Sequence, residues 1–253
     1  TSLPRPPLSS AIQPLYIEIS GRVGLWLLTH VAPSGSYGVS ILWKTLAVPA
    51  ITYASDVLAL TPTFWKTVER HQLELGRWCL GGNGITANAA ITGEMSWSTF
   101  VQREARSKLQ YLGRLSFLPQ QNYAGRLYRY LRYRKFKTNW IKKITSLDSR
   151  YSKGTNRQHA KTVKEWEKTV KTEVDKTDLE LWKHNMEQRT SLETYRTFKN
   201  KPCVVKQYRG DQASALLFQA RTGSLLTQKR KLDLFGDTDT KCMICGSHVE
   251  DVT

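Results

Sequence analysis

Apolar residues recur at intervals of three and four along much of the chain, a spacing typical of helices that pack by one face. The pattern is clearest over residues 98–117 and 158–199, where it continues for several turns. Its apolar positions are Val101, Ala105, Leu109, Leu112 and Leu115 in the first stretch and Val163, Trp166, Val170 and Val174 in the second. Little of the chain alternates with the period of two typical of strands. We therefore predict a mostly α-helical fold.

Breaking and capping residues set the expected limits of the other helices. Residues 39–60 are apolar but contain Pro49, which lacks a backbone donor, so we expect a kinked or split helix pair there. A further helix is expected to begin at Thr61-Pro62 and to end at Gly81-Gly82.

Runs of small or turn-forming residues indicate irregular segments. Residues 1–38 are rich in Pro, Ser and Gly, and residues 81–93 read GGNGITANAAITG, so we expect a loop in each. The second run lacks the Gly-Lys-Ser/Thr of a phosphate-binding loop. A short helix is expected at residues 214–219, with Gly223 as its cap.

Positive charge is concentrated in one fifth of the chain. The 253 residues carry a formal net charge of +17. Residues 101–150 hold thirteen Lys and Arg against two acidic residues. Such a block repels itself unless a polyanion neutralises it, so nucleic acid is the expected partner. A basic face that only water contacts is the alternative.

Aromatic residues alternate with the cations of this basic block. Guanidinium groups contact phosphates, and aromatic faces stack on unpaired bases. The predicted nucleic-acid-binding residues are Arg126, Arg129, Arg132, Arg134, Lys135, Lys137, Lys142, Lys143, Tyr128 and Tyr133. Leu127, Tyr130 and Leu131 follow helical spacing, so we expect about half of the aromatics to pack inward. A membrane-surface helix is less favoured, because Tyr interrupts the polar face.

Two of the four cysteines, Cys242 and Cys245, form a C-x-x-C pair followed by Gly246. In a reducing compartment this spacing favours a metal over a disulfide. A closed zinc site needs four ligands, and His248 follows Cys245 too closely to be a comfortable one. We therefore expect half of a zinc site, completed by ligands beyond Thr253 in a longer protein. The absence of an initial Met also suggests a fragment.

Several segments resemble, in order, the region that follows the catalytic palm of non-LTR (LINE-type) retrotransposon reverse transcriptases. They are LWKTLAVPAITYASDVLALT at residues 42–61, Val68-Glu69-Arg70-His71-Gln72 with Leu80-Gly81, LLFQARTGSLLTQKR at residues 216–230 and CMICGSHVEDVT at residues 242–253. The resemblance covers most of residues 39–253. It implies thumb-like helices, a linker and a truncated Cys-Cys-His-Cys zinc knuckle, with zinc bound only in the full-length protein.

The polymerase centre of that family is not found in this sequence. Such enzymes hold two magnesium ions on paired aspartates, and no Asp-Asp occurs in the chain. Ala54 and Asp56 also stand where the family more commonly has Gly and Glu. Tyr53-Ala54-Ser55-Asp56 carries one displaced carboxylate, and we do not expect it to be catalytic. Magnesium chemistry is thus expected in the parent polymerase only.

The sequence therefore suggests a helical fragment of an RNA-directed DNA polymerase polyprotein that grips template RNA or target DNA. The alternative is a free-standing basic helical nucleic-acid-binding protein unrelated to retrotransposons. An independent catalyst is disfavoured, because the five histidines are scattered. We expect an intracellular, nuclear or nucleocytoplasmic location, no membrane and no small-molecule substrate. The expected regions are an irregular lead-in (1–38), a thumb-like helical region (39–118), a basic helical linker (119–210) and a helix with the truncated knuckle (211–253).

Overall fold

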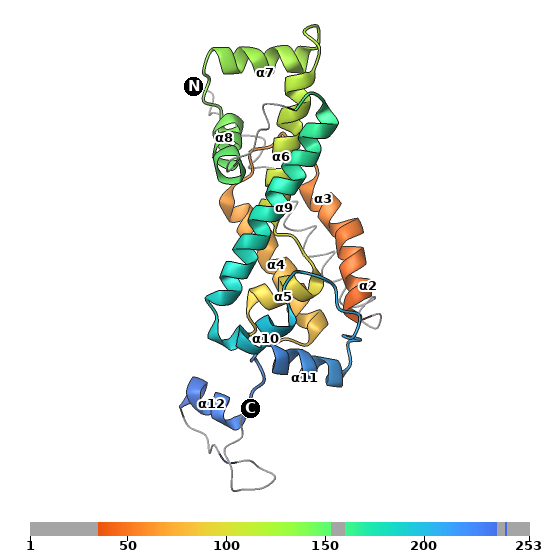
Figure 1. Ribbon diagram of the computed structural model, residues 1–253, viewed down its shortest axis with the longest axis vertical. Helices are drawn as coiled ribbons and strands as arrows, with labels where there is room; N and C mark the ends of the chain where they lie inside the picture. Colours follow the sequence, from red (N-terminus) through yellow and green to blue (C-terminus); the bar gives the residue numbers. More distant parts are fainter. Residues whose placement is uncertain (1–34, 153–159, 237–240, 242–253) are drawn as a thin grey trace, which may run out of the picture. The chain divides into compact units, whose positions relative to one another are not determined.

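The computed structural model describes residues 35–152, 160–236 and 241, which are mostly α-helical and include no strand (Figure 1). The predicted mostly α-helical fold is confirmed. The helices are α2 (Gly35–Leu42), α3 (Val48–Thr52), α4 (Pro62–Leu80), α5 (Asn88–Met95), α6 (Phe100–Phe117), α7 (Tyr123–Tyr133), α8 (Asn139–Tyr151), α9 (Val163–Glu187), α10 (Glu193–Phe198), α11 (Gln212–Arg221) and α12 (Gln228–Phe235). A π-helical turn, η2 (Trp43–Ala47), joins α2 to α3, and a 3-10 turn, η4 (Thr190–Leu192), precedes α10.

The chain folds into two compact units, each assembled from separate stretches. Among the described residues, unit 1 contains residues 43–71, 98–152 and 160–181. Unit 2 contains residues 35–42, 72–97 and 182–236, together with residue 241. The basic block of residues 101–150 therefore belongs to unit 1.

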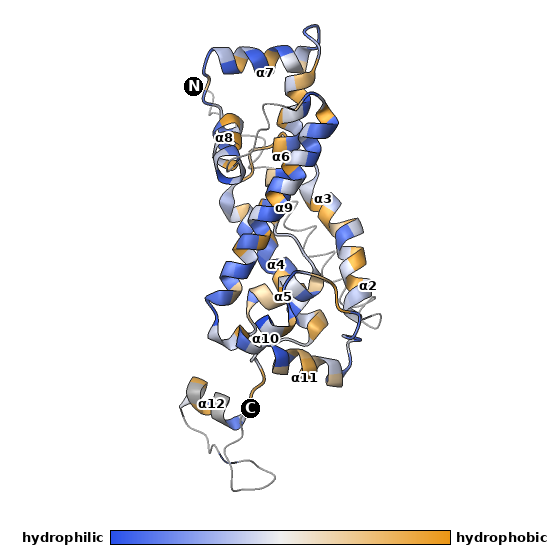
Figure 2. Ribbon diagram, in the orientation of Figure 1, coloured by the Kyte–Doolittle hydropathy of each residue, from blue (hydrophilic) through white to orange (hydrophobic). Residues whose placement is uncertain are grey.

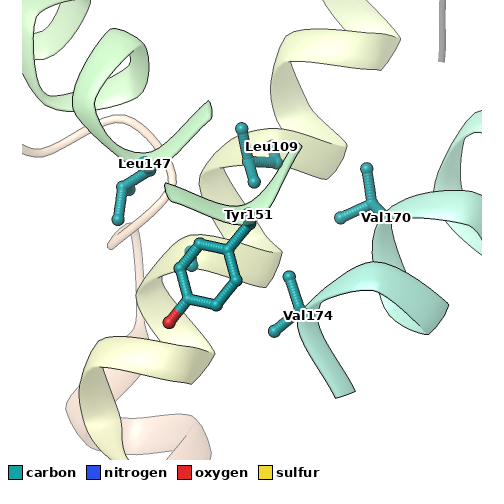
Figure 3. Close-up of a cluster of buried hydrophobic side chains, with 6 residues drawn as sticks. Leu109, Leu147, Tyr151, Val170 and Val174 are labelled. Atoms are coloured by element: carbon teal, nitrogen blue, oxygen red, sulfur yellow. The ribbon is translucent and has the colours of Figure 1, made fainter. Parts of the chain in front are cut away.

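The core of unit 1 forms where α6, α8 and α9 meet (Figure 3). Tyr151 of α8 lies among apolar side chains from all three helices. The cluster consists of Ala105, Leu109, Leu147, Tyr151, Val170 and Val174. Trp166 of α9 packs beside it on Gly113 of α6, where a Cβ atom would lie 2.1 Å from the indole Cδ1. The apolar spacing predicted for α6 and α9 therefore builds this core.

Unit 2 is centred on α5, which occupies part of the run predicted to be a loop. That prediction is wrong for residues 88–93. The small residues there allow close helix packing, since a Cβ atom on Gly93 would lie 2.6 Å from the Tyr195 hydroxyl and 2.8 Å from the Trp182 ring. The Trp182 indole also donates a hydrogen bond of 2.8 Å to the carbonyl of Ala89. A run of small residues can thus form a tightly enclosed helix.

Helix ends follow the capping residues closely. The Thr61 hydroxyl accepts from the Phe64 amide at 3.2 Å at the start of α4, and Gly81 ends that helix with φ of +66°. Gly223, with φ of +59°, follows α11 as predicted. The predicted helix pair over residues 39–60 is wrong at both ends: helical structure begins at Gly35 and stops at Thr52.

The π-helical turn directly precedes the proline-containing helix α3. Its wider turns accommodate residues whose regular hydrogen bonding a proline interrupts. Residues 53–57 then form a turn in which Ala54 has φ of +55°. Most of the predicted lead-in and the Cys242–Cys245 pair lie outside the described residues.

Candidate nucleic-acid interface

Helix α7 is anchored by its polar side to the end of α6. The Asn122 side chain caps α7 by accepting from the amides of Ala124 and Gly125 at 3.0 and 3.3 Å. A Cβ atom on Gly125 would lie 2.9 Å from the Leu118 Cβ, so glycine permits a close crossing. One turn later, the Arg129 guanidinium donates to the carbonyls of Leu118 (3.1 Å) and Pro119 (3.2 Å). Arg129 is therefore a structural contact in this protein.

This attachment leaves most of the α7 aromatics in solvent. Gly125 is the buried residue of the helix, while Tyr123 and Tyr133 are 84% and 82% exposed. Leu127 and Tyr130 are also more than half exposed. Two of the five aromatics from Tyr128 to Trp140 are partly buried, which is close to the expected half. Helical spacing identifies an apolar face without showing whether a neighbour covers it. In Figure 2, α7 is coloured mostly hydrophilic, whereas α2 and α3 have more apolar colouring.

A tight reversal connects α7 to α8 and presents two lysines. The amide of Lys135 bonds to the Arg132 carbonyl at 3.1 Å, and the amide of Phe136 bonds to the Leu131 carbonyl at 3.0 Å. Lys135 has φ of +54°, a conformation that glycine adopts more easily. Lys135 and the following Lys137 are both exposed.

Helix α8 is held against the rest of unit 1 by polar contacts as well as by the apolar core. The Trp140 indole donates to the carbonyl of Asp56 at 2.7 Å. The ammonium of Lys143 pairs with the Glu104 carboxylate at 3.0 Å, and Glu104 is fully buried. Lys143 is therefore committed to an internal ion pair, whereas the neighbouring Lys142 is exposed.

Lys108 of α6 holds the turn at residues 53–57 against that helix. It is fully buried and donates to the carbonyls of Ser55 and Leu58, with Glu104 at 3.6 Å. Burial lowers the pKa of Lys108, and the Glu104 carboxylate opposes that shift. The Asp56 carboxylate accepts from the Val57 amide within the same turn. Residues 53–56 therefore belong to a turn that is held by structural hydrogen bonds.

A cavity of about 890 Å³ opens between α6, α7, α8 and the start of α9. We call it the α7–α8 cavity. Its lining includes the partly exposed rings of Tyr128, Phe136, Trp140 and Trp166 and the cations Arg132, Lys135 and Lys137. Trp166 lies far along the chain from the basic block, and only the amphipathic pattern of residues 158–199 indicates that it packs there.

The structure separates the ten predicted binding residues into three groups. Arg126, Arg132, Arg134, Lys135, Lys137, Lys142 and Tyr133 are exposed on α7, the reversal and α8. Tyr128 is half-buried in the wall of the α7–α8 cavity. Arg129 and Lys143 contact the protein itself. Six cations therefore remain in a position to contact a polyanion.

Within the described ranges, no group of three or more His, Cys, Asp or Glu side chains could hold a metal ion. The described helices include none long and apolar enough to cross a bilayer. Comparisons of the chain with models of protein families, with curated proteins and with solved structures found no match.

Proposed function

We propose that this chain binds RNA or DNA through the exposed cations of α7, the reversal and α8. The observation that carries the proposal is their concentration: the chain has no Asp or Glu from residue 105 to residue 147, and six cations of this stretch are exposed on one connected segment. A polyanion is the natural counterpart of such a surface, and phosphate contacts dominate nucleic-acid affinity.

The resemblance noted above supports a more specific setting for this binding. In this proposal the chain follows the polymerase centre of a retrotransposon reverse transcriptase and grips template RNA or target DNA while magnesium chemistry takes place elsewhere. Cys242 and Cys245 would supply two of four zinc ligands in the full-length protein. An unrelated free-standing nucleic-acid-binding protein remains the alternative. A Tyr-x-Asp-Asp motif encoded upstream and a His and Cys encoded downstream would distinguish the first from the second.

A salt titration tests the binding itself. The logarithm of affinity for a labelled single strand should fall linearly with the logarithm of salt concentration, by roughly 0.7 per phosphate contact. Replacing Arg126, Arg132, Arg134 and Lys137 with Gln should flatten this slope by up to about three units. Arg129 stays unchanged in this variant, because its guanidinium supports the end of α6.

The matched control removes four other exposed cations of unit 1, Lys164, Lys168, Lys171 and Lys176 of α9. It lowers the net charge by the same amount, so it separates a localised surface from a general charge effect. The control should keep most of the salt slope. Equal slopes for the two variants would contradict a binding surface on α7 and α8.

A further inference from the structure

We infer that the α7–α8 cavity receives an unpaired base, so that the ligand of this surface is a single strand rather than a duplex. The inference rests on the proposed function and specifies which form of nucleic acid the surface binds. A volume of about 890 Å³ lies within the range of sites for drug-sized molecules, and a nucleoside is of that class.

The aromatic part of the lining is held in place before any ligand arrives. The Trp166 indole donates to the Leu109 carbonyl at 2.8 Å, and the Trp140 indole donates to the Asp56 carbonyl at 2.7 Å. Trp140 also packs edge-on against Tyr111. Both indole donors are satisfied within the protein, so what these side chains can offer a ligand is ring surface. Fixed rings lose little conformational entropy when a base stacks on them.

The charged part of the lining fits the backbone that would carry such a base. Arg132, Lys135 and Lys137 line the same cavity as the tryptophans and are exposed. One acid, Asp148, is among the lining residues, and it accepts a hydrogen bond of 3.1 Å from the Ser152 hydroxyl. The aromatic rings could stack on a base while the neighbouring cations contact the phosphates attached to it. A base in a duplex must first leave its stack and its pair, whereas a base in a single strand need not.

The test compares two labelled single strands of about twelve nucleotides, a length within the range of known single-strand sites. One carries its bases and the other is abasic, so the phosphates are the same. By fluorescence anisotropy at fixed salt, the native protein should bind the normal strand about tenfold more tightly, as expected for one stacked base. A blunt duplex of the same length has more phosphates but offers no unpaired base, so its affinity should not change when the cavity is filled as described next.

A variant with a filled cavity provides a second measurement. Ser116 and Thr145 are exposed residues of α6 and α8 that line the cavity, and replacing both with Leu should reduce the affinity for the normal strand to that for the abasic strand. The matched control replaces Ser146 and Ser149 with Leu, because both are exposed on α8 and neither lines the cavity. This control should keep the tenfold preference.

The possible outcomes separate the two proposals. If the native protein binds both strands equally, with salt-dependent affinity, the base site is wrong and the proposed function stands. A preference that survives the S116L/T145L change also overturns the base site. If neither strand binds with a salt dependence, the proposed function itself fails. A thermal melt of each variant checks that it folds, and equal binding of the two strands by the native protein overturns the base site without any variant.

Discussion

Helices α7 and α8 are similar in sequence character and different in what they contact. Both are basic, both contain aromatic and aliphatic residues, and both begin at a polar residue whose side chain accepts from the first turn. Helix α8 buries Ile144, Leu147 and Tyr151, whereas Gly125 is the buried residue of α7. The difference shows that amphipathic spacing identifies an apolar face but does not decide whether it serves as core or as contact surface.

The largest expected effect comes from the same truncation made on each helix. Leu147→Ala removes a core side chain that is 4% exposed and should lower the free energy of unfolding by about 2–5 kcal/mol. Leu127→Ala removes an α7 side chain that is 58% exposed and should change it by about 0.5 kcal/mol or less. Urea denaturation of both variants measures the difference. Similar losses would mean that α7 is packed as α8 is.

Two adjacent lysines of α8 are expected to have different roles, one in folding stability and the other in nucleic-acid binding. Lys143→Met leaves the buried Glu104 with one fewer cation and should cost about 1–3 kcal/mol. Lys142→Met alters an exposed side chain and should cost about 0.5 kcal/mol or less, while lowering the salt slope of strand binding. Denaturation and salt titration of both variants test the assignment. A stability loss at Lys142 that matches the loss at Lys143 would refute it.

The smallest effect is a pH dependence near the end of α8. Burial raises the pKa of Asp178 to about 6, and the Tyr151 hydroxyl, 3.4 Å away, partly opposes the shift. Between about pH 4 and pH 6 the native state binds more protons at this carboxyl than the unfolded state does, so its contribution to stability is lost as the pH rises.

Comparison of variants isolates this contribution. Relative to the native protein, Asp178→Asn should gain about 1 kcal/mol of stability between pH 4 and pH 6, a value reduced for partial solvent exposure. Melting temperatures measured across this range test the prediction. If the difference in melting temperature between the native protein and D178N does not change with pH, Asp178 is not the origin of the pH dependence.

The sequence predicted the elements whose determinants are local. The Thr61 cap, the left-handed Gly81 and the spacing of Val170 and Val174 each act within a few residues, and the structure has them as expected. The helix α5 was missed because its small residues are explained by Trp182 and Tyr195, which lie about ninety or more residues away.

The sequence indicated which residue types make up the candidate site but not how the fold arranges them. Charge and aromatic content identified the basic block, and six of its predicted binding cations are exposed in the structure. The roles of Arg129 and Lys143 were not predictable, because they depend on the carbonyls at the end of α6 and on the buried Glu104. The cavity depends on Trp166, which reaches it only when α9 folds back along α6.

The buried amine of Lys108 also makes the opening of unit 1 visible to covalent labelling. An acylating reagent needs access to the nitrogen, and that nitrogen lies inside the protein, bonded to two carbonyls. The exposed amines of Lys135 and Lys142 should react at once. Acylation of Lys108 should proceed only as fast as the turn at residues 53–57 detaches from α6, so mass spectrometry over time would report the frequency of that opening.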